Sequence, residues 1–229
     1  RRHPAWRFCH TALASTEQHN QQHTVQQNLS ILAPLGLAID DAPAKMGYSD
    51  QDWRASRALL PEEFQDNYIV IQPTSRWFFK CWREARMSAL INALSDAGYP
   101  VVLTSGPDAR EKQMIDTIMA GCPDARLHSL AGLLTLRQLA SVIDHARLFI
   151  GVDSVPMHMA AALGTPLVAL FGPSKLTFWR PWQAKGEVIW AGDFGSIPDP
   201  DDIDTGTDER YLDLIPTDAV IAAAKKVLA

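Results

Sequence analysis

The stretch from Gly151 to Ser174, GVDSVPMHMAAALGTPLVALFGPS, constrains the fold of this 229-residue chain more than any other segment. Residues 147–150, just before it, form a short apolar run that predicts a buried parallel strand ended by the first glycine of the stretch. Ser154 as N-cap and Gly164 as terminator predict a short helix. A second apolar run, 167–171, predicts the next buried strand. The stretch therefore predicts a strand, helix, strand unit.

This unit directs the N-terminus of a helix to the carboxyl edge of a parallel sheet, where open α/β sheets bind ligands. The amides of Val155, Met157 and His158 are expected to be available to hold a phosphate, whereas Pro156 has no N–H to donate. A capped crossover helix without a ligand is the alternative, and the geometry alone does not separate the two. Three polar side chains at one helix end, Asp153, Ser154 and His158, favour a binding site.

Strands and helices alternate along the chain from Tyr68 onward. The expected strands are 68–72, 101–104, 126–129, 147–150, 167–171 and 187–190, and the expected helices are 82–97, 108–120, 136–145, 154–163 and 217–228, with Thr135 and Thr217 as N-caps. This alternation predicts an α/β fold with a doubly wound parallel sheet of about six strands. The segment before Tyr68 lacks the alternation and predicts two helices, at 25–35 and 50–60.

Two further loops lie at the same expected edge. The loop after the first strand carries Thr74, Ser75 and Lys80, and hydroxyls with a cation suit a diphosphate, although many surface loops have this composition. The loop and helix after the second strand carry Gly106, with Asp108 and Glu111 close behind it. A carboxylate at that position binds ribose hydroxyls in related folds, and the sequence leaves open which of the two acids does so.

The pattern Asp-Ser-x-x-x-His followed by Ala-Ala-Ala-Leu-Gly-x-Pro-x-Val-Ala-Leu-Phe-Gly-Pro-Ser resembles the signature of glycosyltransferase family 9, the bacterial heptosyltransferases. Residues 178–182, Phe-Trp-Arg-Pro-Trp, resemble its continuation, and the chain from about His23 to Ala229 is most similar to the heptosyltransferase III branch. The resemblance implies a GT-B fold. It assigns residues 67–229 to the C-terminal, donor-binding domain and residues 1–66 to a remnant of the N-terminal acceptor domain and the linker.

The resemblance also implies an activity, the inverting transfer of heptose from ADP-L-glycero-D-manno-heptose to the inner core of lipopolysaccharide. No cofactor is required, and the need for a divalent metal stays open. Thr74, Ser75 and Lys80 match the family's diphosphate-binding residues, although the spacing before Lys80 is altered. Asp153 matches the residue that accepts hydrogen bonds from sugar hydroxyls, with capping of the following helix as its structural alternative.

The same resemblance gives roles to the residues around this acid. Ser154, Val155 and His158 are expected to contact the donor, and Val155 stands where the family commonly has Gly or Ala. Leu134, in the segment LAGLLTL, is expected near the adenine, with core packing as its alternative role. The family's general base lies near the start of its N-terminal domain, which no segment here matches. We therefore expect the catalytic base to be missing and this chain alone to be inactive.

Two other classes of function stay open at this point. A nucleotide-sugar epimerase or hydrolase has the same fold, and so does a non-catalytic module that binds ADP-sugars. The chain has no GxGxxG after its first strand and no GxxxxGK[ST], which argues against nicotinamide enzymes and P-loop NTPases.

Composition limits the partners and the compartment. The net charge is −5, which argues against nucleic-acid binding, and no run of 18 apolar residues is present. Three widely spaced cysteines and no metal-ligand spacing predict free thiols in the cytoplasm and no metal site. Arg1, Arg2, Trp6 and Arg7 form a basic aromatic segment, which predicts either a solvated loop or a peripheral contact with the inner membrane.

Overall fold

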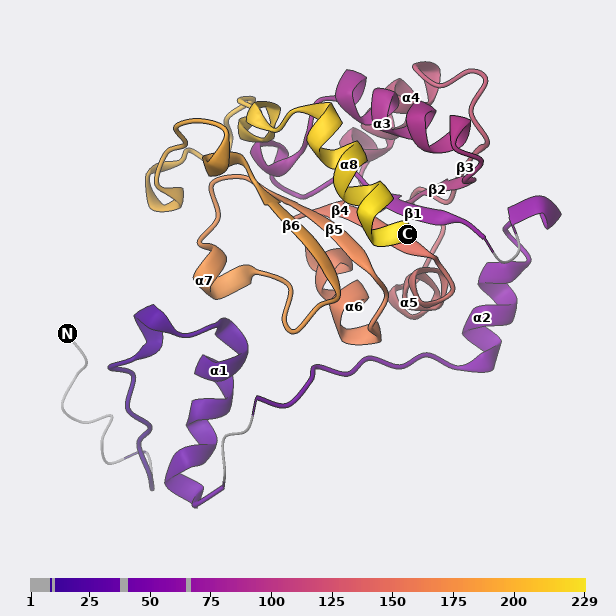
Figure 1. Ribbon diagram of the computed structural model, residues 1–229. Helices are drawn as coiled ribbons and strands as arrows, with labels where there is room; N and C mark the ends of the chain where they lie inside the picture. The colour runs from indigo at the N-terminus through magenta and orange to yellow at the C-terminus, as the bar shows by residue number, and fades with distance from the viewer. Residues whose placement is uncertain (1–8, 10, 38–40, 65–66) are drawn as a thin grey trace. The chain divides into compact units, whose positions relative to one another are not determined.

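A computed structural model describes residues 9, 11–37, 41–64 and 67–229 (Figure 1). The basic aromatic segment at residues 1–7 lies outside the described residues. The chain divides into two compact units, Arg1–Pro43 with Lys175–Arg180, and Ala44–Ser174 with Pro181–Ala229. The larger unit contains the whole sheet and every residue of the predicted site.

The sheet of the larger unit consists of six parallel strands in the order β3-β2-β1-β4-β5-β6. The strands are β1 (Ile69–Gln72), β2 (Val101–Leu103), β3 (Leu127–Ser129), β4 (Leu148–Val152), β5 (Leu167–Phe171) and β6 (Gly186–Trp190). The predicted six-stranded α/β sheet is therefore confirmed. The strand order reverses between β1 and β4, and open α/β sheets bind ligands outside the carboxyl ends of the strands at such a reversal.

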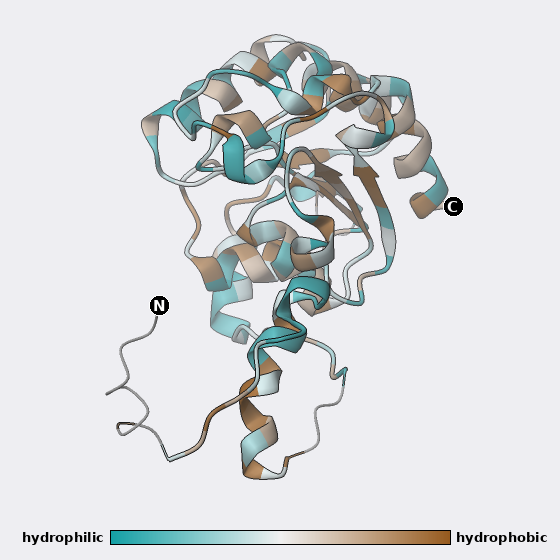
Figure 2. Cartoon of the chain, turned by 90° about the vertical axis from the view of Figure 1, so that its left-hand side faces the viewer, coloured by the Kyte–Doolittle hydropathy of each residue, from teal (hydrophilic) through white to brown (hydrophobic). Residues whose placement is uncertain are grey.

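Helices cover both faces of this sheet. Figure 1 shows α3, α4 and α8 on one face and α5 and α6 on the other. The bounds are α2 (Asp50–Arg57), α3 (Glu84–Asp96), α4 (Ala109–Ala120), α5 (Leu136–Asp144), α6 (Val155–Leu163) and α8 (Thr217–Leu228). Strands β1, β2, β4 and β5 are buried at every position, as parallel strands covered on both faces must be. Figure 2 shows these hydrophobic strands in the interior of the unit.

Gly151 was expected to end its strand, and that prediction is wrong. Strand β4 continues through Gly151 to Val152, and Gly151 pairs with Gln72 on one side and Ala169 on the other. A Cβ at Gly151 would lie 2.6 Å from ring carbons of Phe149. The glycine therefore makes room for an aromatic ring and does not break the strand.

The capping predictions had mixed outcomes. Thr135 caps α5 as predicted, because its side chain accepts a hydrogen bond from the amide of Gln138. Thr217 was predicted to cap α8, but it is the first helical residue and Pro216 holds the N-cap position. Proline has no amide hydrogen and a fixed φ, so it suits the entry to a helix.

Two predicted helices are shorter than the patterns suggested. The helix expected over 82–97 begins at Glu84, because Arg83 has the extended backbone of an N-cap residue; Trp82, before it, is fully buried. The helix expected over 25–35 is α1 (Thr24–Leu29) followed by a 3-10 helix over Ser30–Leu35. Pro34 lies inside the second part, where it removes an amide hydrogen that an α-helix needs.

The smaller unit contains a 3-10 helix over His19–Gln21, α1, the 3-10 helix that follows α1, and α7 (Leu176–Trp179). His23 begins α1 with a capping box, in which its ring accepts from the amide of Val25 and Gln26 accepts from the amide of His23. The other ring nitrogen, Nε2, lies 2.8 Å from the carbonyl oxygen of Arg180. One histidine thus connects two segments that are far apart in the sequence.

Helix α2 packs on α5 within the larger unit. The hydroxyl of Ser56 lies 3.0 Å from that of Ser141, and the rings of Trp53 and His145 stack with centroids 3.6 Å apart. The larger unit begins at Ala44, and the domain boundary between residues 66 and 67 stays a prediction. In the described part of the chain, no helix has the length and apolar character needed to cross a membrane.

Candidate functional site

A cluster of polar side chains lies where the loops after β1, β4 and β5 meet. Asp153 follows β4, Lys80 ends the loop after β1, and Ser174 follows β5. Lys80 Nζ donates to Asp153 Oδ2 at 2.6 Å, and Ser174 Oγ donates to the same oxygen at 2.5 Å. Adjacent parallel strands bring these three residues together although more than 90 residues separate the first from the last.

The carboxylate of Asp153 is largely enclosed but keeps one oxygen free. Its side chain is 7% exposed and that of Lys80 is 14% exposed. The second oxygen, Oδ1, accepts no hydrogen bond from the residues that the structure describes. Asp153 does not cap α6, which was the structural alternative for this residue, because Ser154 holds the N-cap position. The carboxylate is available to a ligand through Oδ1.

A second set of hydrogen bonds links β1, β2 and α4. Thr104 Oγ1 donates to Gln72 Oε1 at 2.7 Å, and Gln72 Nε2 donates to Thr74 Oγ1 at 2.8 Å. Thr74 Oγ1 then donates to Glu111 Oε2 at 2.5 Å. Thr74 is 1% exposed. Its hydroxyl hydrogen is committed to Glu111, so in this structure Thr74 orients a carboxylate and does not face open space.

Glu111 and Asp108 have different environments. The amide of Gly106 donates to Glu111 Oε2 at 2.9 Å, and a Cβ at Gly106 would lie 3.1 Å from Glu111 Oε1. Gly106 thus allows the carboxylate a close approach. Asp108 is the N-cap of α4, where its side chain accepts from the amides of Arg110 and Glu111. Of the two acids, Glu111 is the one directed toward the loop after β1.

The loop after β1 is fixed by buried contacts. The amide of Ser75 donates to Cys81 Sγ at 3.2 Å, and both residues are buried. Burial raises the pKa of the Cys81 thiol to about 11. Because the thiol is neutral near pH 7, Cys81 supports the loop and is not a nucleophile.

The N-terminus of α6 follows Asp153 directly. Ser154 is its N-cap, but no amide bonds to the side chain; the hydroxyl donates to the carbonyl of Val152 at 3.3 Å. Val155 is 62% exposed, and His158 lies in the first turn. The Ser154 side chain thus caps no amide of α6. The amide of Met157 donates to the carbonyl of Ser154 at 3.2 Å, so it is not the free donor that the sequence suggested.

The segment expected near a nucleotide base lies beside the loop after β2. The amide of Gly132 donates to the carbonyl of Ser105 at 3.0 Å. Gly132 has a φ of +69°, which favours glycine. Leu134 is half-buried two residues further on, between β3 and α5. This contact brings Leu134 to the same edge as Gly106.

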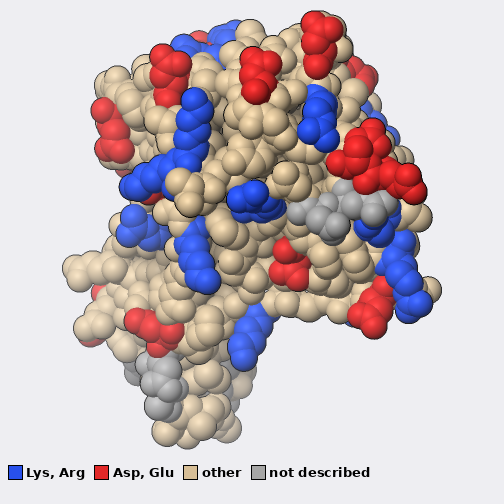
Figure 3. Space-filling view, turned by 45° about the vertical axis from the view of Figure 1, so that its right-hand side comes forward, with Lys and Arg blue, Asp and Glu red and all other residues tan. Residues whose placement is uncertain are grey.

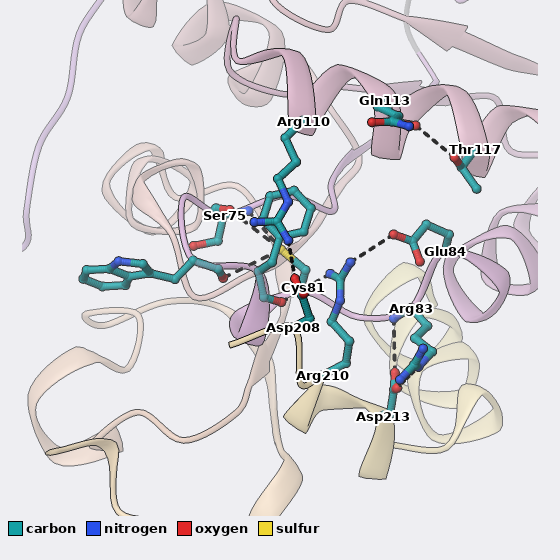
Figure 4. Close-up of polar contacts among 12 residues, drawn as sticks. Ser75, Cys81, Arg83, Glu84, Arg110, Gln113, Thr117, Asp208, Arg210 and Asp213 are labelled. Atoms are coloured by element: carbon teal, nitrogen blue, oxygen red, sulfur yellow. Dashed lines mark hydrogen bonds and ion pairs between the residues drawn. The ribbon is translucent and has the colours of Figure 1, made fainter. Parts of the chain in front are cut away.

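A separate hollow of about 220 Å³ lies between α4 and the loop before α8 (Figure 4). The guanidinium groups of Arg110 and Arg210 lie 4.0 Å and 4.8 Å from the ring centroid of Phe78. Arg110 pairs with Asp208 at 2.6 Å, and Arg210 pairs with Glu84 at 3.2 Å. Both cations are already neutralised, so we interpret this hollow as a structural connection between α3, α4 and the loop.

Sequence reasoning missed three members of the site, namely Gln72, Thr104 and Ser174. Each is a polar residue at or just beyond the end of a buried strand, and that position was the available signal.

Among the described residues, no group of three or more His, Cys, Asp or Glu side chains could hold a metal ion. Figure 3 shows basic and acidic side chains interspersed over one face of the molecule.

Comparison with known proteins identifies the family of this chain. The family model of glycosyltransferase family 9 (heptosyltransferase) matches residues 5–205. Lipopolysaccharide heptosyltransferase 3 of Escherichia coli is 44% identical over 224 residues, which are 97% of this chain and 64% of that relative. The chain thus spans slightly less than two thirds of the length of this relative.

Two solved structures show the same fold. The glycosyl transferase family 9 structure from Veillonella parvula DSM 2008 has a TM-score of 0.77 at 22% identity, over 95% of this chain and 62% of that one. The E. coli heptosyltransferase WaaC with ADP has a TM-score of 0.62 at 21% identity, over 90% of this chain and 57% of that one. The fold is the α/β, Rossmann-like fold found in GT-B glycosyltransferases. The chain belongs to glycosyltransferase family 9, as its sequence motifs predicted.

Proposed function

We propose that this chain is the donor-binding part of a heptosyltransferase, which transfers heptose from ADP-heptose to the inner core of lipopolysaccharide with inversion. The observation that carries the proposal is the cluster of Lys80, Asp153 and the α6 N-terminus at the strand-order switch. The name of the E. coli relative supports the acceptor class, and the E. coli heptosyltransferase solved with ADP supports the donor class. We propose residues 67–229 as the donor domain.

In this proposal the diphosphate lies between Lys80 and the first turn of α6. An ammonium group and helix-terminal amides are both favourable partners for phosphate oxygens. Ser75 belongs to the same loop as Lys80, and Val155 and His158 contribute from the helix, with Ser154 at its start.

Asp153 serves the heptose. Like charges repel, so its carboxylate does not face phosphate directly; Oδ1 instead accepts hydrogen bonds from sugar hydroxyls. Lys80 lies between the sugar and the diphosphate in this proposal, because it contacts Asp153 Oδ2 on one side and the phosphate oxygens on the other. One cation thus links the sugar-binding carboxylate to the diphosphate.

Glu111 and Leu134 serve the nucleoside. Glu111 accepts from the ribose hydroxyls, Thr74 holds its carboxylate in place, and the amide of Gly106 supports it. Leu134 packs on the adenine, while backbone groups of its segment contact the base edge. Asp108 has a structural role in this scheme, because its side chain is engaged as the N-cap of α4.

The chemistry follows from this arrangement. The bond between the anomeric carbon and the phosphate oxygen breaks as the acceptor oxygen bonds to that carbon from the opposite side. Lys80 and the α6 amides stabilise the negative charge that develops on ADP. A carboxylate base from the acceptor-binding half takes the proton of the acceptor hydroxyl. The acceptor is a membrane lipid, so the reaction takes place at the cytoplasmic face of the inner membrane.

Nucleotide titration tests the proposal. ADP is expected to bind more tightly than UDP or GDP by calorimetry, and ADP-heptose is expected to slow hydrogen exchange at residues 74–80, 106–111, 130–136 and 153–158. Equal and weak binding of all three nucleotides would contradict the adenine assignment. Release of free heptose without any acceptor would instead indicate a hydrolase.

A further inference from the structure

Ser174 is fixed by the turn that follows β5. The carbonyl of Gly172 accepts from the amide of Ser174 at 2.8 Å and from Trp190 Nε1, on β6, at 3.1 Å. A Cβ at Gly172 would lie 2.6 Å from a methyl carbon of Leu212, so the turn packs closely against the segment before α8. Ser174 itself is 8% exposed. The Ser174 hydroxyl is therefore attached to a rigid, buried part of the backbone.

That hydroxyl and the Lys80 ammonium share a single oxygen of Asp153. Both donors contact Oδ2, at 2.5 Å and 2.6 Å, which leaves Oδ1 without a bond from any described residue. The two donors differ in mobility, since a lysine ammonium ends a flexible four-carbon chain whereas a serine hydroxyl is one bond from Cβ. Ser174 is thus the donor that is held in a fixed place.

A bound nucleotide-sugar gives Lys80 a second set of partners besides Asp153. The two phosphate groups of a bound donor attract the Lys80 ammonium away from Asp153. The hydrogen bond between Lys80 and Asp153 then becomes longer or less well aligned. If Lys80 were the sole partner, the carboxylate could rotate with it and present either oxygen to the ligand. A second, fixed donor on Oδ2 prevents that rotation.

We propose that Ser174 is a positioning residue, which holds the carboxylate of Asp153 so that Oδ1 faces the sugar of the bound nucleotide-sugar. The inference rests on the proposed function, because it assigns to Ser174 a part in recognising the heptose. Ser174 acts through Asp153 and contributes to the selectivity for ADP-heptose over ADP. It does not touch the diphosphate.

Calorimetry with ADP and with ADP-heptose tests this role. Ser174→Ala is expected to weaken binding of ADP-heptose about tenfold, the size expected for a lost hydrogen bond to a charged group, and to change ADP binding by less than about twofold. Ser174→Thr keeps a hydroxyl and is expected to restore most of the discrimination. Ser141→Ala removes a buried hydroxyl in α5, away from the site, and is the matched control.

Two further variants make the test decisive. In an Asp153→Ala background, Ser174→Ala is expected to add little, because Ser174 acts through the carboxylate that the first variant removes. If Ser174→Ala does not fold, the near-isosteric Ser174→Cys replaces it, since a thiol is a weak donor. Equal losses for both ligands, or unchanged discrimination in the Ala or Cys variant, would overturn the role of Ser174. If the unaltered protein binds neither ligand, the proposed function itself fails.

Discussion

Thr74 and Glu111 are 37 residues apart in the sequence, and their side chains meet in a hydrogen bond of 2.5 Å at the edge of the sheet. Thr74 also accepts from Gln72, so its hydroxyl is fully engaged. The threonine that matches a diphosphate-binding position in the family is therefore the support of a carboxylate in this structure. We therefore propose that Thr74 acts on a bound ligand through Glu111.

Replacing Thr74 by Val tests this relationship. The variant removes the donor to Glu111 and leaves Gln72 Nε2 without its best acceptor, so we expect ADP affinity to fall about five- to tenfold. We also expect a loss of about 1–3 kcal/mol in the free energy of unfolding, because a buried amide loses a partner. Calorimetry and urea denaturation measure the two effects. Thr117→Val on the exposed face of α4 is the control, and equal ADP affinity in both variants would contradict the role.

Asp153→Ala is expected to separate sugar binding from nucleotide binding. Loss of the carboxylate removes hydrogen bonds to the heptose, so affinity for ADP-heptose falls about tenfold or more. ADP affinity is expected to stay the same or rise, because the variant frees Lys80 and removes a negative charge near the diphosphate. A parallel loss for ADP and ADP-heptose, with the fold intact by circular dichroism, would exclude a sugar-directed role.

Lys80→Met is expected to reduce the preference for diphosphates. The variant keeps a long apolar side chain but lacks the ammonium, so ADP affinity falls about tenfold while AMP affinity changes less. Competition binding with ADP and AMP at two salt concentrations measures this. The control is Lys226→Met, because Lys226 forms an exposed ion pair with Glu187. The assignment is wrong if both variants bind ADP as the unaltered protein does.

The three cysteines are expected to differ in reactivity. Burial raises the pKa of the Cys81 thiol to about 11 and also raises the pKa of Cys122, whereas Cys9 is exposed. Because the thiolate is the reactive form, only Cys9 is expected to react quickly with a disulfide reagent at pH 8. We thus expect one fast-reacting thiol in the native unaltered protein and none in the native Cys9→Ser variant. The unaltered protein in denaturant is expected to show three. Fast reaction of a second native thiol would contradict the burial of Cys81 or of Cys122.

The free energy of unfolding is expected to fall as the pH rises into the alkaline range. Since the pKa of Cys81 is raised on folding, its contribution to stability is complete below the unfolded-state value near 9 and is lost as the pH rises toward about 11. Urea denaturation between pH 8 and pH 11 measures this loss. Cys81→Ala is expected to flatten the profile, and an identical profile in that variant would assign the effect to other groups.

Gly151→Ala is expected to destabilise the sheet. The added Cβ would lie 2.6 Å from ring carbons of Phe149, in a strand paired on both sides. Overpacking of this kind costs about 1–3 kcal/mol, so the melting temperature falls by several degrees. Gly47→Ala is the matched control, because a Cβ there meets nothing within 4 Å. Equal melting temperatures for the two variants would show that the Phe149 ring can move aside.

The larger fold was predictable because its signals are local. Buried parallel strands are short apolar runs, and helices begin and end at capping residues such as Thr135 and Gly164, so alternation from Tyr68 onward predicted six strands in an α/β sheet. The motif around Asp153 identified the family for the same reason, since its residues are contiguous. Errors occurred where a residue's role depends on a distant neighbour, as Gly151 depends on the ring of Phe149.

The sequence by itself determined the class of the fold, the family, and Lys80 and Asp153 as candidate binding residues. It left the choice between Asp108 and Glu111 open. Only the tertiary structure decided how these side chains are held. Strand order places β1 between β2 and β4, so Lys80 reaches Asp153 and Thr74 reaches Glu111. Ser174 joins them because β5 is the next strand along the sheet. Pairing between parallel strands is set by packing across the whole sheet, and no local pattern in the chain records it.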